Sequence, residues 1–534
     1  MTLLSIQDLS VALPKKADRE YAVREASFDL DAGELLCIVG ESGSGKSMTA
    51  NALMGLLPPG VRIAGGRAIF DGNDLTAMPE REQQRLRGAD MAMIFQEPMT
   101  ALNPLLRIGD QIAEVFEAHG RLKQDERIAR AIALADEVGL PDPKQIVRAY
   151  PFQLSGGQRQ RAMIAMALAL EPKLLIADEP TTALDVTTQA QILRLIQDLR
   201  EKRGMGVLFI THDFGVVAEI ADRVIVMRHG EIVEAGTADA VLKNPQHPYT
   251  RELLDAIPTD IVTQSAKREN APALEVVGLN KTFTSGGGLF RKKRVVRAVQ
   301  DVNLTIAKGE VLGLVGESGS GKSTVGRAIV RLLTPDSGTI RVTGEDLSGA
   351  DGEALRTLRR KVQMVFQDPY ASLNPRGRVM RALTAGPIAH GVSRADAEAR
   401  ALELLDIVGL GAAAAERFPH EFSGGQRQRI GIARALAMDP EVIVADEAVS
   451  ALDVSIQAQI LDLLRDLRER LSLSLLFVTH DLRVAAQLCD RIAVMQHGKI
   501  VEMGPVSDVF LSPREPYTQS LLAAVPGADW SAAA

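Results

Sequence analysis

An internal duplication constrains the fold of this chain more than any other feature of its sequence. The segment GESGSGKS occurs at Gly40–Ser47 and again at Gly316–Ser323, and FQEPMTALNP (Phe95–Pro104) returns as FQDPYASLNP (Phe366–Pro375). Three more pairs follow in the same order: LSGGQRQR with FSGGQRQR, IADEPTTALDV with VADEAVSALDV, and FITHD with FVTHD. A chain of 534 residues that repeats five segments in one order is expected to fold as two similar domains.

The spacing of the repeats sets the domain boundaries. Lys46 and Lys322 lie 276 positions apart, and Asp178 and Asp446 lie 268 apart. A period this long indicates a duplicated domain, because solenoid repeats are about 20–50 residues long. Each copy is long enough to build its own hydrophobic core. We therefore expect a first domain at 1–258, a polar linker at 259–272, a second domain at 273–526 and a short tail at 527–534.

Composition excludes several classes of protein. With 46% hydrophobic and 24% charged residues the chain is globular, and its net charge of −7 offers no positive excess for a nucleic-acid backbone. Its two cysteines, Cys37 and Cys489, are too few for a disulfide scaffold or a four-thiolate metal site. The N-terminus lacks the pattern of a signal peptide, and uncharged apolar runs fall short of the roughly 20 residues that span a bilayer. These observations predict a cytosolic chain that does not itself cross a membrane.

Short apolar runs predict the fold class. ELLCIVG (Glu34–Gly40), KLLIA (Lys173–Ala177) and GVLFIT (Gly206–Thr211) are almost continuously apolar, as strands buried on both faces of a parallel sheet are. Helix-compatible stretches alternate with them. This alternation predicts an α/β fold in each half.

Both GESGSGKS segments fit the phosphate-loop pattern G-x-x-x-x-G-K-[ST]. Its glycines let backbone N–H groups turn around phosphate oxygens, its lysine reaches the β/γ-phosphates and its last serine can ligate Mg²⁺. One such match could be a flexible turn, but each copy here follows a predicted strand and precedes a predicted helix. We expect a nucleoside triphosphate to contact Gly40, Glu41, Ser42, Gly43, Ser44, Gly45, Lys46 and Ser47 in the first half, and Gly316, Glu317, Ser318, Gly319, Ser320, Gly321, Lys322 and Ser323 in the second.

An acidic pair follows the second apolar strand of each half. Asp178-Glu179 and Asp446-Glu447 lie at the carboxyl end of a strand, where open α/β sheets bind ligands. The first carboxylate of each pair suits Mg²⁺, and the second is placed to polarise an attacking water. The alternative is a solvated loop start, which is less favoured in a chain with two phosphate loops.

The SGGQ segments predict capped helix N-termini. In Ser155, Gly156, Gly157 and Gln158, and in Ser423, Gly424, Gly425 and Gln426, the serine and glutamine have the spacing of a capping box. The two glycines cost about 1 kcal/mol each in helix propensity relative to alanine. We interpret that cost as room for close approach of a phosphate, because helix N-termini bind anions.

These motifs, in this order, resemble those of ATP-binding cassette (ABC) ATPases over essentially the whole chain, twice. The resemblance implies two tandem P-loop NTPase domains, each with a mainly parallel core sheet, an antiparallel β subdomain and a helical signature subdomain. It implies that Gln96 and Gln367 are Q-loop residues that contact Mg²⁺ or the water. It further implies catalytic glutamates, switch histidines and D-loop aspartates, which are Glu179, Glu447, His212, His480, Asp185 and Asp453.

The resemblance also implies how the parts share their sites. Each half would supply the metal ligands of one site, which are Ser47, Gln96 and Asp178 in the first half and Ser323, Gln367 and Asp446 in the second. The SGGQ segment of one half would complete the nucleotide site of the other. The aromatic that stacks on adenine stays open, with Tyr21 and Phe283 as candidates.

The end of each half narrows the resemblance. HPYTRELLDAIP (His247–Pro258) and EPYTQSLLAAVP (Glu515–Pro526) resemble the segment that marks ATPases of peptide and nickel importers. A fused pair of cassettes of this length is similar to the subunit of oligopeptide/microcin C importers (the Yej type), with glutathione-import ATPases as close competitors. The implied cofactors are ATP and Mg²⁺, and no iron–sulfur cluster is expected because the chain has only two cysteines. The implied partners are two transmembrane permease subunits and a separate substrate-binding protein, at the cytoplasmic face of the bacterial inner membrane.

Two other classes of function were weighed. A soluble double cassette acting on ribosomes or DNA typically has a longer charged linker or zinc-binding cysteines, and the sequence has neither. A non-enzymatic regulatory pair is less favoured because both halves keep their hydrolytic positions. Leu154 and Pro180 become Phe422 and Ala448 in the second half, and neither change removes a phosphate- or metal-contacting group. The glycine- and arginine-rich segment Ser285–Arg294 is expected to be a solvated loop.

Overall fold

The computed structural model describes residues 1–15, 17–181, 184–256, 271–285, 294–450 and 452–526. The chain divides into two compact units, with the break between residues 257 and 258. Strand β11 begins at Pro272, at the end of the segment expected to be a linker. The rest of that linker up to residue 270, the centre of the expected 285–294 loop and the tail lie outside the described residues.

The first unit is built on a six-stranded sheet in the order β10-β9-β3-β8-β7-β6. All its neighbours run parallel except the edge pair β9–β10, which is antiparallel. Every residue of β3, β7 and β8 is buried, so these strands are apolar on both faces, as expected for α/β. The strands are β3 (Leu35–Val39), β6 (Met91–Ile94), β7 (Leu174–Asp178), β8 (Gly206–Ile210), β9 (Arg223–Arg228) and β10 (Glu231–Thr237).

A second, antiparallel sheet has the order β2-β1-β4-β5. Its strands are β1 (Thr2–Ala12), β2 (Tyr21–Asp31), β4 (Arg62–Phe70) and β5 (Asn73–Asp74). One hydrophobic core joins the two sheets and helix α1, and it includes Leu4 of β1, Leu53 of α1 and Ile176 of β7. This shared core fixes the phosphate loop, which precedes α1, between the sheets.

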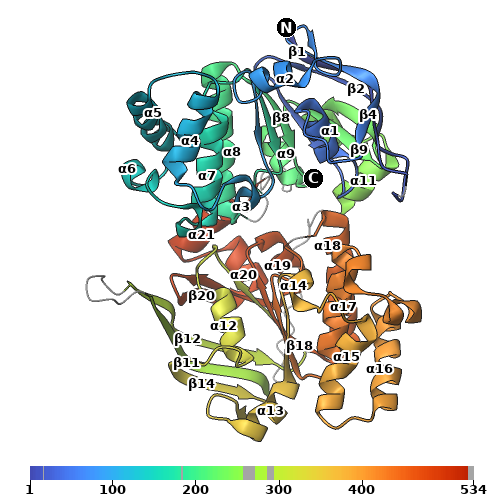
Figure 1. The fold of residues 1–534 in the computed structure, drawn as a ribbon. Coiled ribbons are helices and arrows are strands. Elements are labelled where there is room, and N and C mark those ends of the chain that lie inside the picture. The colour runs from blue at the N-terminus through green and yellow to red at the C-terminus, as the bar shows by residue number, and fades with distance from the viewer. Residues whose placement is uncertain (16, 182–183, 257–270, 286–293, 451, 527–534) are drawn as a thin grey trace. The chain divides into compact units, whose positions relative to one another are not determined.

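Helices make up the rest of the first unit. In Figure 1, α4, α5, α6 and α7 gather on the side of the core sheet away from β1, β2 and β4. The apolar face of α4 repeats every four residues, and Ile108, Ile112 and Phe116 are all buried. The helices are α1 (Lys46–Leu53), α2 (Glu80–Leu86), α3 (Pro98–Ala101), α4 (Ile108–Ala118), α5 (Gln124–Glu137), α6 (Pro143–Ile146), the 3₁₀ helix η1 (Pro151–Gln153), α7 (Gly156–Ala167), α8 (Val186–Arg203), α9 (Phe214–Ile220), α10 (Ala238–Lys243) and α11 (Pro248–Asp255).

The second unit repeats both sheets, in the orders β16-β17-β18-β13-β19-β20 and β12-β11-β14-β15. Its strands are β11 (Pro272–Ser285), β12 (Arg294–Ala307), β13 (Val311–Val315), β14 (Ser337–Val342), β15 (Glu345–Asp346), β16 (Val362–Val365), β17 (Val442–Asp446), β18 (Ser474–Thr479), β19 (Arg491–Gln496) and β20 (Lys499–Pro505). Its helices are α12 (Lys322–Ile329), α13 (Gly352–Lys361), α14 (Pro369–Ser372), α15 (Val379–Ala389), α16 (Arg394–Ile407), η2 (Ala412–Glu416), η3 (Pro419–Glu421), α17 (Gly424–Leu436), α18 (Val454–Leu471), α19 (Leu482–Leu488), α20 (Val506–Leu511) and α21 (Pro516–Ala523).

The topology brings the sequence motifs to one edge of each core sheet. In the first unit the phosphate loop follows β3, the acidic pair ends β7 and the histidine follows β8, and these three strands are parallel neighbours. Their carboxyl ends therefore meet at the same edge. Among the described helices, none combines the length and the apolar composition needed to span a bilayer.

Candidate active site

The phosphate loop between β3 and α1 depends on glycine at two positions. A Cβ on Gly40 would lie 2.2 Å from the carbonyl oxygen of Met227, and one on Gly45 would lie 2.5 Å from that of Ala22. Both residues have positive φ angles, 149° and 109°. Only glycine allows the backbone this close approach in that conformation. Gly43, by contrast, faces open space, with no atom within 4 Å of the place where its Cβ would be.

A buried lysine follows each loop. Lys46 is 5% exposed, and its Nζ donates hydrogen bonds to the carbonyl oxygens of Gly40 (2.6 Å) and Glu41 (3.0 Å). Lys322 makes the equivalent bonds in the second unit, at 2.6 and 2.9 Å. The ammonium lies at the first residue of α1 or α12, where the helix dipole also favours an anion. Open glycine, cation and helix N-terminus together fit a phosphate group.

A hydroxyl and a carboxylate meet beside each lysine. Ser47 Oγ donates a 2.9 Å hydrogen bond to Asp178, and Ser323 Oγ donates one of 2.8 Å to Asp446. Burial raises the pKa of Asp178 to about 6, with a smaller contribution from the charge of Glu179, although the bond from Ser47 opposes the shift. The pKa of Asp446 is raised as well, again chiefly by burial. Serine and aspartate oxygens are ligands that Mg²⁺ prefers, so the residues fit this cation.

The structure brings the glutamate, glutamine and histidine of the first unit together. The N–H of Glu179 donates to the carbonyl oxygen of Ile210 (2.9 Å), and the residue has a φ of 46°. This left-handed turn is costly for a residue with a side chain and is held by the neighbouring strand. Gln96 Nε2 donates to the Glu179 carboxylate at 2.9 Å, and His212 Nδ1 lies 3.4 Å from it.

The second unit has the same arrangement. Glu447 has a φ of 48°, and its N–H donates to Val478 at 2.8 Å. Gln367 Nε2 lies 2.7 Å and His480 Nδ1 3.5 Å from its carboxylate. Burial alone would raise the pKa of Glu447, but the bond and charge of His480 outweigh it and lower the pKa. Burial likewise opposes the charge on His480, and Glu447 overcomes it and raises the pKa of the imidazole.

Both predicted capping boxes are present and confirm the helix starts. Ser155 Oγ accepts from the N–H of Gln158 (3.3 Å), and Gln158 Oε1 accepts from the N–H of Ser155 (3.0 Å). The Ser423–Gln426 pair has the same two bonds, at 3.3 and 3.1 Å. These boxes begin α7 and α17.

The paired glycines at these helix starts have different roles. A Cβ on Gly157 would lie 2.6 Å from the side chain of Thr188, and one on Gly425 would lie 2.3 Å from that of Ile456. The second glycine is therefore required by packing against α8 or α18, so its helix-propensity cost has a structural reason that the sequence interpretation missed. Gly156 faces open space within 4 Å, and only this first glycine leaves room for a ligand.

The remaining predicted residues lie at element ends. Asp185 caps α8, because its carboxylate accepts from the N–H of Thr188 at 2.9 Å. Asp453 precedes α18 without a side-chain capping bond. The two adenine candidates are not equivalent: Tyr21 begins β2, whereas Phe283 lies on β11, the counterpart of β1.

Sequence reasoning did not place the C-terminal segments at the site. Tyr249 of α11 accepts a 3.3 Å hydrogen bond from the N–H of Glu41 in the phosphate loop. Tyr517 of α21 accepts the equivalent bond from Glu317 at 3.2 Å. The recurrence of PYT in both halves was the signal available in the sequence, but it gave no indication of which residues these tyrosines contact.

Comparisons with known proteins agree with this geometry. The family model described as ABC transporter matches residues 23–182 and 299–450. The model described as the C-terminal region of oligopeptide/dipeptide transporters matches 233–285 and 501–533.

Similar proteins match over nearly their whole length. The glutathione import ATP-binding protein GsiA of Salmonella choleraesuis is 48% identical over 99% of this chain and 90% of its own. The peptidoglycan transport ATP-binding protein YejF of Agrobacterium fabrum is 48% identical over 98% of this chain and 96% of its own. A dimeric post-hydrolysis structure of the cassette MJ0796 bound to ADP and Pi is 28% identical, with a TM-score of 0.40, over 44% of this chain and 98% of that one.

Fold, site and family match define an ATPase with two nucleotide-binding cassettes. The chain belongs to the ABC transporter family. Within that family it carries the oligopeptide/dipeptide transporter C-terminal region in both of its halves.

Proposed function

We propose that this chain hydrolyses ATP to drive the uptake of peptides or peptide-like compounds through separate permease subunits. The observation that carries the proposal is the oligopeptide/dipeptide C-terminal region, which matches the end of each cassette. Relatives matched over nearly the whole chain are named for import of glutathione and transport of peptidoglycan. Both names, and the microcin C importers that the sequence resembles, concern peptides or peptide-containing compounds.

Each site is proposed to bind MgATP through its phosphate loop. Lys46 and Lys322 neutralise phosphate charge, and Ser47 with Asp178, or Ser323 with Asp446, supplies oxygen ligands for Mg²⁺. The bound cation would neutralise charge between the β- and γ-phosphates. Gln96 and Gln367 complete the proposed metal ligands, and the SGGQ helix starts are proposed to contact the γ-phosphate.

Hydrolysis is assigned to the glutamate that ends each acidic pair. Its carboxylate would polarise a water for attack on the γ-phosphate, while the glutamine and histidine beside it hold its orientation. The distances of 2.9 Å from Gln96 and 3.4 Å from His212 to Glu179 support this arrangement. The same chemistry is proposed for Glu447 with Gln367 and His480.

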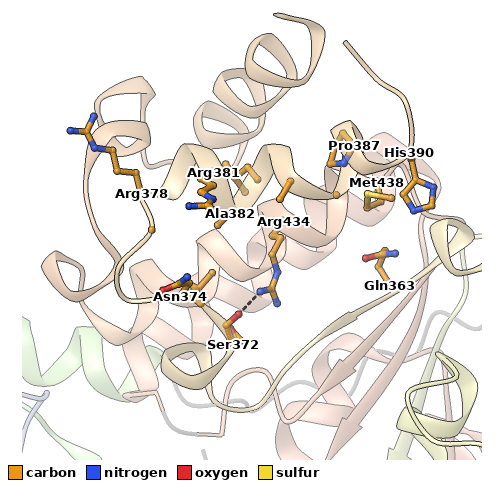
Figure 2. A pocket seen from close by; sticks show the side chains of 15 residues that line it. Gln363, Ser372, Asn374, Arg378, Arg381, Ala382, Pro387, His390, Arg434 and Met438 are labelled. Carbon is orange, nitrogen blue, oxygen red and sulfur yellow. Dashed lines mark hydrogen bonds between the residues drawn. The ribbon is translucent and has the colours of Figure 1, made fainter. Parts of the chain in front are cut away.

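The proposed partners are two permeases in the bacterial inner membrane and a separate substrate-binding protein. The chain would reach the cytoplasmic face of that membrane only through the permeases. A cavity of about 560 Å³ in the second unit, beside the segment after the Q-loop, supports one such contact. It is lined by Arg378 and Arg381, with Arg434 and His390, and none of its described lining residues is acidic. Figure 2 shows Arg434 reaching Ser372 at its floor, and the cavity suits an acidic permease segment.

The first unit differs at the matching positions. Gln111 stands where the second unit has Ala382, and it is 4% exposed. Its side chain accepts from the N–H of Asn103 (2.8 Å) and donates to the carbonyl of Leu106 (3.1 Å), which closes the loop before α4. Leu105 and Leu106 are exposed here, at 82% and 39%. An apolar permease segment fits this surface better than an acidic one.

Uptake in cells tests the proposed function. A strain lacking this gene and its neighbouring permease genes would receive both back, and ATP-dependent uptake of labelled di- and tripeptides and of glutathione would be measured. We expect uptake with the natural chain and none with the Glu179→Gln, Glu447→Gln double variant. Cosedimentation with ribosomes or DNA, without uptake of any of these compounds, would instead support the soluble double-cassette alternative.

A further inference from the structure

The tyrosine of each PYT segment contacts the phosphate loop of its own unit. Tyr249 Oη accepts from the N–H of Glu41 at 3.3 Å, across 208 residues of sequence. Tyr517 repeats this contact with Glu317 at 3.2 Å. The duplication has therefore kept the same hydrogen bond in two separately folded units.

The phosphate-loop lysine holds the other end of the same peptide group. The carbonyl of Gly40 accepts from Lys46 Nζ at 2.6 Å, while the N–H of Glu41 donates to Tyr249. The Gly40–Glu41 peptide is planar, so a partner at each end fixes its orientation. The lysine that would meet the phosphates and the tyrosine thus share one rigid peptide.

The segment around Tyr249 is itself anchored. The Glu234 carboxylate of β10 accepts from the N–H of Gln246 (2.7 Å) and of His247 (3.1 Å). His247 Nδ1 then accepts from the N–H of Tyr249 at 3.1 Å, which caps α11. The Arg228 guanidinium lies 4.5 Å from the centre of the tyrosine ring. These contacts hold a side chain that is 2% exposed.

The second unit keeps the anchor but loses part of the packing. Its Glu502 carboxylate accepts from the N–H of Arg514 (2.8 Å) and of Glu515 (3.3 Å). Gln496 replaces the arginine that covers the ring in the first unit, and Tyr517 is only half-buried. The bond to the loop is thus common to both units, although the surroundings of the ring are not.

We propose that Tyr249 and Tyr517 are positioning residues for ATP, and that the C-terminal segment of each half acts as a clamp on its phosphate loop. The tyrosine does not touch the nucleotide in this proposal. It keeps the Gly40–Glu41 peptide, and through it the lysine and the loop N–H groups, in the geometry that accepts phosphates. The inference rests on the proposed role of the lysine in phosphate binding.

Removing one hydroxyl tests the clamp. Tyr249→Phe keeps the ring and deletes only the acceptor for Glu41. In a Lys322→Ala background, which leaves the first site to bind nucleotide, we expect an affinity for a fluorescent ATP analogue about five-fold weaker, the size expected for one lost hydrogen bond. The KM for ATP should rise by a similar factor with kcat less affected, because the loop would still reach its bound geometry at saturating ATP.

Matched variants separate positioning from general damage. In the same Lys322→Ala background, Tyr517→Phe should leave affinity unchanged, because it acts on the disabled loop, and Tyr150→Phe serves as a further phenol control. Unchanged affinity in Tyr249→Phe, or an equal loss in Tyr517→Phe, would overturn the clamp. If Tyr249→Phe does not fold, Tyr517→Phe in a Lys46→Ala background repeats the test at the less buried tyrosine. Normal ATP binding by the Lys46→Ala, Lys322→Ala double variant would instead contradict the proposed function on which the clamp rests.

Discussion

The side-chain amide of Gln96 donates a 2.9 Å hydrogen bond to the carboxylate of Glu179, 83 residues further along the chain. Strands β6 and β7 are parallel neighbours, so the residues that follow them emerge at the same edge of the sheet. Gln96 belongs to the segment that leads into the helical part of the unit. A change in that part of the unit can therefore be felt directly at the glutamate assigned to hydrolysis.

Replacement of Gln96 should slow hydrolysis more than it weakens binding. Gln96→Ala removes one of the partners that orient Glu179, and we expect kcat to fall about ten-fold at that site, a modest part of the 10²–10⁴ typical of a general base. Phosphate release and nucleotide affinity would be measured in the Lys322→Ala background. Gln84→Ala, at an exposed glutamine of α2, is the control. A loss of affinity with kcat intact would show that Gln96 acts on binding instead.

Removal of both glutamate carboxylates should separate binding from turnover. The Glu179→Gln, Glu447→Gln double variant should bind ATP normally and lose at least about 100-fold in turnover, because an amide cannot take a proton from water. Lys46→Ala with Lys322→Ala should lose binding itself. Isothermal titration and phosphate release would measure the two effects, and near-normal turnover in the glutamate variant would refute its assignment.

The family resemblance predicts that the SGGQ segment of the second half serves the phosphate loop of the first. Lys46→Ala and Ser423→Arg should then disable the same nucleotide site. Combining them in one chain should cost little more ATPase activity than either change alone, because the second lesion strikes a site already lost. Lys46→Ala with Ser155→Arg, which would strike both sites, is the control. A combined loss as large as that of the control would contradict the pairing.

The charge difference between the units should decide how each contacts a permease. Arg381→Asp gives the second unit the carboxylate that Asp110 provides in the first, and it should reduce peptide uptake by repelling an acidic partner segment. ATPase activity of the isolated chain should be unchanged. Asp110→Arg in the first unit is the matched reversal and should reduce uptake less. Equal uptake in Arg381→Asp and the natural chain would remove the case for an acidic partner.

The pair formed by His480 and Glu447 should make stability depend on pH. The pKa of His480 is raised from 6.5, so its contribution is complete below pH 6.5 and is lost as pH rises through the raised value. The pKa of Glu447 is lowered from 4.5, so its contribution is lost only below pH 4.5. The urea midpoint of His480→Gln should therefore fall furthest below that of the natural chain between pH 4.5 and 6.5, and approach it at higher pH.

A second histidine provides the control for this trend. Burial, helped by the charges of Arg356 and Arg360, lowers the pKa of His390 from 6.5. Its protonation therefore costs stability as pH falls below 6.5, and His390→Gln should relieve that cost. The difference between this variant and the natural chain should run opposite to that of His480→Gln. A common pH trend in both variants would show that the effect does not come from the pair with Glu447.

The sequence alone determined the repeated architecture and the local chemistry of this protein. Phosphate loops, continuous apolar strands and capping boxes are encoded by residues within a few positions of one another, because backbone geometry and hydrogen bonding at that range depend on local residue types. The start of α7 at Ser155 and the acidic residues at the end of β7 follow from such short patterns. The family match confirms the class of protein that those patterns predicted.

Only the tertiary structure decided which distant side chains meet. The contact between Tyr249 and Glu41 depends on how α11 packs beside the phosphate loop, and no local pattern encodes that packing. The need for glycine at Gly157 likewise appears only when α8 lies against α7. Substitution of Gln111 by alanine in the second half has a consequence only in three dimensions, where the loss of side-chain volume accompanies a basic cavity. Contacts of this kind depend on the approach of whole elements, because side-chain volume and burial are set by neighbours hundreds of residues away.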